Sequence, residues 1–183
     1  MKELSLHILD VAENGINAGA ERVGITVEEA RKDNRLRIII TDNGRGIPAD
    51  LLHNVTNPFY TTRTTRRVGL GLSLLEAAAC QCNGSLRVES TEGRGSKIIA
   101  EFDYDHIDRA PLGDMTGTLI SLIIGYPDVD FEYFHTVDRR RFEMKTVEIK
   151  KMFDDRPLSD SDVFRKLRTV LQDGLKRLKT SEE

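Results

Sequence analysis

TDNGRGIPADLLHNVTNPFYTTRTTRRVGLGLSLL, residues Thr41–Leu75, is the stretch that decides the fold. Two glycine pairs, Gly44/Gly46 and Gly69/Gly71, enclose an aromatic pair and a segment rich in threonine and arginine. Glycine permits left-handed backbone and close approach of a ligand to the main chain. A nucleotide-binding loop and a mobile structural loop both fit this composition, and the remainder of the chain separates them.

The bulk composition is that of an ordinary globular protein. The chain has 183 residues, 39% hydrophobic and 31% charged, which suits one medium domain or one domain with a small addition. A formal net charge of −3 gives no electrostatic reason to expect binding to nucleic acid or to a membrane. No stretch approaches the roughly 20 apolar residues of a membrane span, and the N-terminus does not resemble a signal peptide.

Cys80 and Cys82 are the only thiols, and no set of metal ligands surrounds them in the sequence. We expect one buried thiol within a helix and one thiol near the end of that helix. Sparse, unpaired cysteines predict a reducing environment, so the expected location is cytoplasmic.

Hydrophobic periodicity predicts the order of elements in the first part of the chain. A helix, two strands, a short helix, a loop, a helix and a strand hairpin follow one another, which is typical of an α+β fold. We expect a two-layer α/β sandwich with a mixed sheet and helices on one face. The predicted helices are Met1–Gly19, Pro48–Val55 and Gly71–Cys82, and the predicted loop is Asn57–Arg67. The predicted strands are Arg22–Glu29, Leu36–Thr41 and the hairpin pair Ser85–Ser90 and Ser96–Phe102.

The composition changes after residue 104. We predict one domain over residues 1–104, a linker over 105–112 and a small α+β region over 113–183, whose role the sequence does not identify. The sequence leaves open whether this last region packs on the first domain or forms a homodimer. Its predicted elements are a helix over Gly113–Gly125, a hairpin of Val129–Thr136 with Arg139–Val147, and a basic helix over Val163–Lys179.

Polar side chains form a stripe along the first predicted helix. At about 100° per residue, His7, Asp10, Asn14 and Asn17 fall on one side, away from the apolar stripe. A carboxylate can orient or deprotonate a nucleophile, and an amide oxygen one turn away is a suitable Mg²⁺ ligand. A solvated helix face is the alternative interpretation.

Two glycine clusters offer backbone groups beside polar side chains. Asp42 directly follows a buried strand and can accept a hydrogen bond from an exocyclic amine such as that of adenine, although an ordinary turn is the alternative. The sequence Gly69-Leu70-Gly71-Leu72 opens a helix, whose first N–H groups can bind phosphate. Neither a P-loop nor a dinucleotide-binding fingerprint is present.

Five motifs follow one another along the chain: DVAENGINAGA, TDNGRGIP, NPFYTTR, VGLGLSLL and EGRGSK. Taken in this order, they resemble the ATP-binding domain of the GHKL superfamily, over about Leu4 to Phe102. This superfamily contains histidine kinases, gyrase-like heat-shock chaperones, type II topoisomerases and mismatch-repair ATPases. The resemblance implies the Bergerat-type ATP-binding fold, with ATP and Mg²⁺ as cofactors. The aromatic segment looks most like that of histidine kinases, and ENGINAGA is nearer the mismatch-repair style.

The resemblance also implies individual roles. Asn14 would hold Mg²⁺, Asp42 would accept the adenine amine, and Ser96 would support the adenine end. Gly44 and Gly46 would make room for the ring. Gly69 and Gly71 would surround the phosphates, and residues 61–68 would form a lid with Arg63, Arg66 and Arg67 near the triphosphate. Further predicted contacts with ATP are Ile47, Phe59, Thr61, Thr62, Leu70 and Leu72.

One position departs from the superfamily pattern. The acid four residues before the Mg²⁺ asparagine is usually glutamate there, and here it is Asp10, whose carboxylate reaches roughly 1.5 Å less. Glu13 is a second candidate for the catalytic acid, although it lies about 60° off the stripe. Hydrolysis or phosphoryl transfer is therefore expected to be slow or to need a partner that completes the site.

Two functions follow from the resemblance. The first is a regulator that binds ATP and phosphorylates a separate, unidentified protein, because no helical hairpin with an acceptor histidine precedes the ATP-binding part of this sequence. The alternative is an ATP-gated interaction switch with weak or no turnover. A DNA-acting ATPase is disfavoured by the short chain and its acidic balance.

Overall fold

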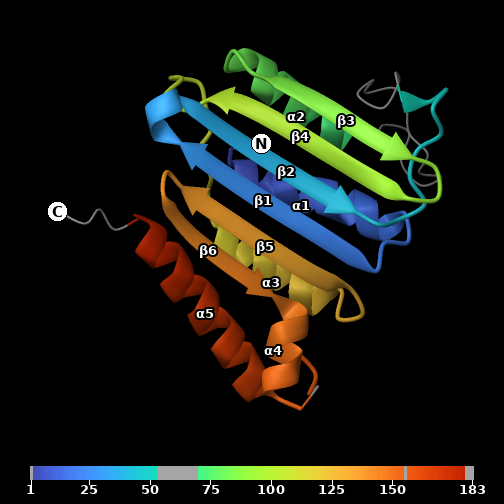
Figure 1. Cartoon of the computed structure of the whole chain (residues 1–183), viewed down its shortest axis with the longest axis vertical. Helices are drawn as coiled ribbons and strands as arrows, with labels where there is room; N and C mark the ends of the chain where they lie inside the picture. Colours follow the sequence, from blue (N-terminus) through green and yellow to red (C-terminus); the bar gives the residue numbers. More distant parts are fainter. Residues whose placement is uncertain (1, 53–69, 155, 180–183) are drawn as a thin grey trace.

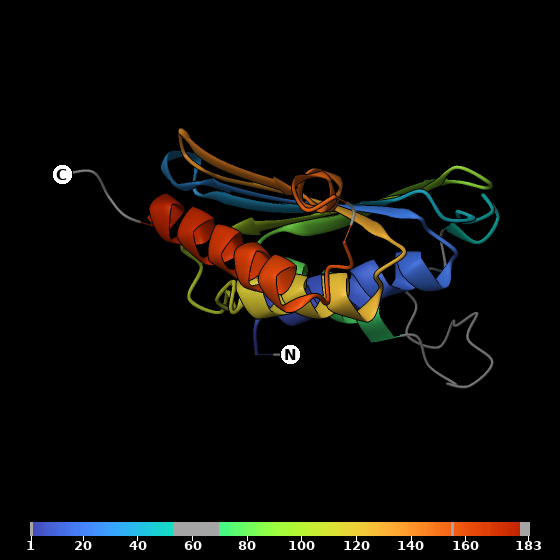
Figure 2. The same ribbon diagram turned by 90° about the horizontal axis from the view of Figure 1, so that it is seen from below.

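The computed structural model describes residues 2–52, 70–154 and 156–179, and its strands form one mixed sheet with helices against one face (Figures 1 and 2). This confirms the α+β class and the two-layer arrangement. The strands are β1 (Arg22–Ala30), β2 (Arg35–Asp42), β3 (Ser85–Thr91), β4 (Gly95–Asp103), β5 (Asp130–Val137) and β6 (Arg140–Lys145). The helices are α1 (Leu4–Asn17), α2 (Leu70–Gln81), α3 (Met115–Gly125), α4 (Thr146–Met152) and α5 (Ser161–Lys179), with a 3-10 turn, η1, at Arg31–Asp33.

The sheet order is β3-β4-β2-β1-β5-β6 (Figure 1). Every neighbouring pair is antiparallel except β1 and β5, which run parallel. The chain therefore returns beneath the sheet from β4 through α3 before β5 joins the free edge of β1, since parallel neighbours need a long crossover. Residues 113–154 and 156–179 thus pack on the first part of the chain, and the pairing of β5 with β6 confirms the predicted hairpin. The domain boundaries at 104 and 113 stay a prediction.

The sheet holds α1 in a fixed orientation through an apolar layer. Alternate residues of β1 and β2 point toward the helices, as the period of two requires. The buried side of α1 is mostly apolar, and each large aliphatic side chain buried there adds about 1.5–3 kcal/mol to the free energy of unfolding. The residues of this layer include Leu4, Ile8, Val11, Val23, Ile25, Val27, Leu36, Ile38 and Ile40, all at most 2% exposed.

Two glycines let the loops at one end of the sheet touch. Gly46 has φ +68°, and a Cβ there would collide with the carbonyl oxygen of Thr91. Gly95 has φ +95°, and a Cβ there would collide with the carbonyl oxygen of Asp42. The loop after β2 consequently lies directly against the turn between β3 and β4.

Some details differ from the predictions. A short helix was predicted over Pro48–Val55, but the structure describes this segment only as far as Leu52. Within it, Leu51 N–H donates a hydrogen bond of 3.0 Å to Pro48 O and closes a turn. The thiols are reversed: Cys80 within α2 is exposed and Cys82 just after it is buried. Helix α4 was not predicted. In the described part of the chain, every helix is too short or too polar to span a bilayer.

Candidate functional site

Two consecutive residues of α1 contact the two halves of the predicted site. A Cβ on Gly15 would lie 2.7 Å from Asp42 Cβ, so the missing side chain lets the end of β2 press against α1. One residue earlier, Asn14 meets the first turn of α2, because a Cβ on Gly71 would lie 3.4 Å from Asn14 Nδ2. The fold therefore brings together Asn14, Asp42 and Gly71, which are far apart in the sequence.

Asp42 is a half-buried acceptor at the last position of β2. Its Oδ1 accepts a hydrogen bond of 2.9 Å from Gly44 N–H, and the sheet register places it opposite Ser96. Burial raises the pKa of the Asp42 carboxyl above its usual range, although hydrogen bonds from Gly44 and Ser96 oppose this shift. The arrangement suits a carboxyl group that accepts a hydrogen bond from a planar amine.

Ser90 organises the hydroxyl groups beside Asp42. Its Oγ donates to Gly95 O at 2.8 Å, accepts from Ile47 N–H at 2.8 Å, and lies 2.9 Å from Ser96 Oγ. Two predicted residues, Ile47 and Ser96, are thereby joined in one network. Ser90 itself was not predicted, but its position directly opposite Ser96 in the β3–β4 ladder was a usable signal.

The loop after β2 is anchored on both sides. Asn43 Oδ1 accepts hydrogen bonds from the N–H groups of Glu21 and Arg22 at 2.9 and 2.8 Å. Arg45 N–H donates to Ala18 O at 2.9 Å, and Arg45 O accepts from the N–H of Gly93 at 2.7 Å. These bonds hold the loop against the start of β1, the end of α1 and the turn between β3 and β4.

The structure separates the two candidate catalytic acids. Asp10 lies beside the start of α2, since a Cβ on Gly71 would be 3.6 Å from Asp10 Cβ and 4.0 Å from Oδ2. Glu13 points elsewhere: its Oε1 accepts a hydrogen bond of 3.2 Å from the Tyr126 hydroxyl at the end of α3. The geometry therefore favours Asp10, and the catalytic role of either acid stays a prediction.

His7 lies one turn before Asp10 and is only 2% exposed. Its Nδ1 has no hydrogen-bond partner in the part of the chain that the structure describes, and burial lowers the pKa of its imidazole. The helical wheel placed His7 on the polar stripe, but in the structure its side chain is buried.

The residues around Asn14 fit a magnesium ion. The Asn14 amide and the Asp10 carboxylate both lie beside the start of α2, and each carries a hard oxygen atom of the kind that Mg²⁺ prefers. Among the described residues, no group of three or more His, Cys, Asp or Glu side chains could hold a metal ion by itself. Mg²⁺ in nucleotide sites uses few protein ligands and takes others from phosphate and water, which matches this sparse set.

Several predicted contacts lie outside the described residues: Phe59, Thr61, Thr62, Arg63 and Gly69, together with the lid and with Arg66 and Arg67. Leu70 begins α2, and Leu72 in the same turn packs at the margin of the apolar core. The roles of all these residues in binding ATP stay predictions.

Comparisons with known proteins identify relatives of part of the chain. The sensor histidine kinase ZraS of Escherichia coli (strain K12) is 34% identical over 106 residues, which are 58% of this chain and 23% of that protein. The putative sensor histidine kinase NtrY-like of Rickettsia conorii is 30% identical over 108 residues, 59% of this chain and 18% of that protein. The chain thus spans less than a quarter of the length of these curated relatives.

A solved structure shares the fold over a larger part of the chain. The N-terminal domain of a DNA repair protein superposes with a TM-score of 0.55 at 16% identity, covering 78% of this chain and 52% of that one. The family described as histidine kinase-, DNA gyrase B-, and HSP90-like ATPase matches residues 2–106. The chain therefore belongs to this family of histidine kinase-like ATPase domains.

Proposed function

We propose that the chain binds Mg²⁺-ATP at this site and transfers the γ-phosphoryl group to a separate protein. The observation that carries the proposal is that Asn14 and Gly15, consecutive in α1, contact the start of α2 and the Asp42 carboxyl group. A ligand lying along this part of α1 would meet a hydrogen-bond acceptor at one end and a phosphate-binding helix terminus at the other.

Each group has a defined task in this proposal. Asp42 accepts a hydrogen bond from the adenine amine, and the network of Ser90 and Ser96 holds that carboxyl in place. Asn14 is the protein ligand of Mg²⁺, which would neutralise phosphate charge when bound. Asp10 is the carboxylate nearest to the start of α2 and would orient the attacking group or accept its proton.

The described histidines support an acceptor on another protein. His7 and His135 are 2% and 1% exposed, so neither imidazole can reach a nucleotide at the surface. His106 lies just after the last residue of β4, whereas the proposed site adjoins Ser96 near the first residue of that strand. The length of the strand separates His106 from the site by roughly 23 Å. Transfer within one copy to any of these histidines is therefore disfavoured.

The alternative is an ATP-gated switch with little turnover. It is favoured by the short Asp10 side chain, which places the carboxylate farther from a phosphate than glutamate would. In this case nucleotide binding would change the surface offered to a partner without release of phosphate. Homodimer formation and a cytoplasmic location also stay predictions.

Incubation of the purified protein with γ-labelled ATP and Mg²⁺, with and without cell extract, separates these functions. Label on an extract protein supports the kinase, and free phosphate alone indicates an ATPase cycle. Bound nucleotide without either product supports the switch. Asp10→Asn should abolish transfer and retain binding, while Asp33→Asn, at the opposite end of β2, should retain both. If the wild-type protein fails to bind ATP, the proposed function is wrong.

A further inference from the structure

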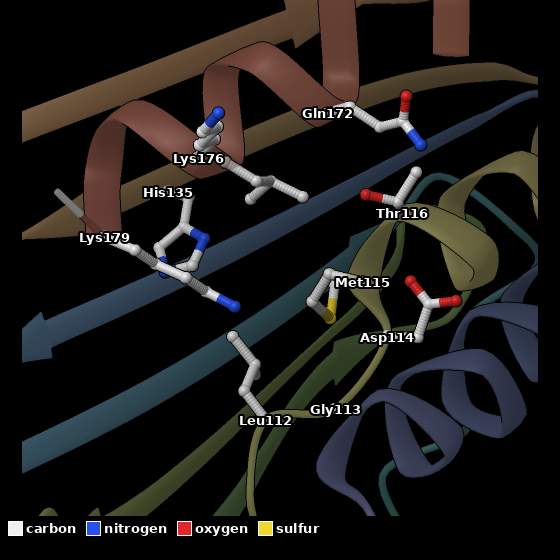
Figure 3. A pocket seen from close by; sticks show the side chains of 10 residues that line it. Leu112, Gly113, Asp114, Met115, Thr116, His135, Gln172, Lys176 and Lys179 are labelled. Atoms are coloured by element: carbon white, nitrogen blue, oxygen red, sulfur yellow. The ribbon is translucent and has the colours of Figure 1, made fainter. Parts of the chain in front are cut away.

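A cavity of about 410 Å³ lies between the start of α3, strand β5 and helix α5 (Figure 3). All its lining residues fall between Leu112 and Lys179, outside residues 2–106 that match the ATPase family. Asp42 and Asn14 line no part of it. The cavity is therefore a feature of the C-terminal part of the chain.

The inner wall of this cavity consists of buried apolar side chains and one imidazole ring. Met115 is 3% exposed and Leu175 is 9% exposed, and Leu112 lies beside them. His135 adds its ring, but both of its nitrogens are engaged: Nδ1 lies 2.8 Å from Tyr133 Oη and Nε2 lies 2.9 Å from Glu29 Oε1. The imidazole is thus held as a wall, with no nitrogen left for a ligand.

The rim of the cavity is polar and carries more positive than negative charge. Lys176 and Lys179 of α5 and Thr116 of α3 line it, and Figure 3 shows Lys179 running across the cavity and the Thr116 hydroxyl directed into it. Asp114 is the one carboxylate in the lining, and its Oδ1 accepts a hydrogen bond of 2.9 Å from Gly117 N–H as the cap of α3. Because the Asp114 carboxylate is engaged in this cap, the Lys179 ammonium group is placed to pair with an anionic ligand.

We propose that this cavity binds a small monocarboxylate with an apolar tail. The carboxylate would pair with the Lys179 ammonium group and accept a hydrogen bond from the Thr116 hydroxyl. The tail would pack on Met115 and Leu175, where burial of apolar surface contributes to affinity. The volume lies within the range of about 300–1,000 Å³ that small-molecule sites occupy.

Titration of the ¹⁵N-labelled full chain with sodium hexanoate, followed by ¹H–¹⁵N chemical shifts, tests this proposal. We expect saturable shifts centred on the amides of Thr116 and Leu175. Hexanol, which keeps the tail without the charge, and acetate, which keeps the charge without the tail, should each bind at least about fivefold more weakly.

Variants locate the two polar contacts. Lys179→Gln should weaken hexanoate binding about fivefold, and Thr116→Val should weaken it by a similar factor. Lys166→Gln, an exposed lysine of the same helix outside the cavity, should bind as the wild type does. The proposal is overturned if hexanoate causes no saturable shifts there, if hexanol binds equally well, or if Lys179→Gln and Lys166→Gln bind hexanoate equally.

Discussion

Replacing Asp42 with asparagine removes one charge and almost no volume, so it isolates the electrostatic role of this carboxyl group. Gly44 N–H donates to Asp42 Oδ1 at 2.9 Å, and only the oxygen of an asparagine can keep that bond. The side-chain NH₂ of Asp42→Asn then occupies the place of Oδ2. An adenine amine would meet a donor where the wild type presents an acceptor.

The expected loss of affinity follows from that geometry. A hydrogen bond to a charged acceptor is worth about 1.5–3 kcal/mol, which corresponds to roughly 10- to 150-fold in the dissociation constant. Two donors facing each other add a further penalty, because neither can then bond to water or to an acceptor. We therefore expect Asp42→Asn to bind ATP at least about 100-fold more weakly.

The same substitution should not destabilise the protein at neutral pH. Burial raises the pKa of Asp42, so the folded protein binds a proton more tightly here than the unfolded chain does. The free energy of unfolding consequently falls as pH rises through the window above the ordinary aspartate pKa. Asp42→Asn lacks this titration and should show a smaller decrease in stability over that pH window.

Isothermal titration with Mg²⁺ and a non-hydrolysable ATP analogue measures the first effect, and urea unfolding at several pH values measures the second. Asp33→Asn, an exposed aspartate at the other end of β2, is the matched control and should bind and unfold like the wild type. Affinity of Asp42→Asn within threefold of the wild type would refute the assigned contact. A loss of more than about 1 kcal/mol in unfolding free energy would indicate that the carboxylate is chiefly structural.

Further substitutions test the metal ligand, the loop contact and the pH dependence. Mg²⁺ should increase the ATP affinity of Asn14→Ala by a factor at least about ten times smaller than in the wild type, measured by titration with and without the metal. An equal gain in both proteins would contradict the assignment of Asn14 as a metal ligand. Gly46→Ala should cost more than about 3 kcal/mol in urea unfolding, because its Cβ meets Thr91 O, whereas Gly93→Ala, also at positive φ but in open space, should cost about 1 kcal/mol. Equal costs would remove the steric argument. Nucleotide affinity should fall on acidification, because protonation removes the acceptor charge of Asp42. Since burial raises the pKa of Asp42, this fall should begin at a higher pH than for an ordinary aspartate. An affinity that stays constant between pH 4 and 7 would count against the role of Asp42.

Much of the fold could be read from local patterns. The helical period of Leu4, Ile8 and Val11 and the alternation of β1 and β2 each place one apolar face, and packing those faces together leaves little choice of arrangement. Asp42 could also be singled out from the sequence, because a carboxylate at the end of a buried strand is less solvated than one on a loop.

The long-range features could not be read in this way. Parallel pairing of β5 with β1 depends on which sheet edge is free, which no short stretch of sequence encodes. Glu13 illustrates the consequence: the helical wheel placed it off the polar stripe, but its partner Tyr126 could not be predicted, because that hydrogen bond exists only where α3 packs on α1. The cavity beside Lys179 likewise arises only from the docking of α5.

A crystal structure with Mg²⁺ and a non-hydrolysable ATP analogue would test the central claim most directly. We expect the adenine amine within hydrogen-bond distance of the Asp42 carboxyl, Asn14 Oδ1 bound to the metal, and the phosphates at the start of α2. Nucleotide bound elsewhere, or bound here with Asn14 away from the metal and Asp42 away from the purine, would contradict the assignment.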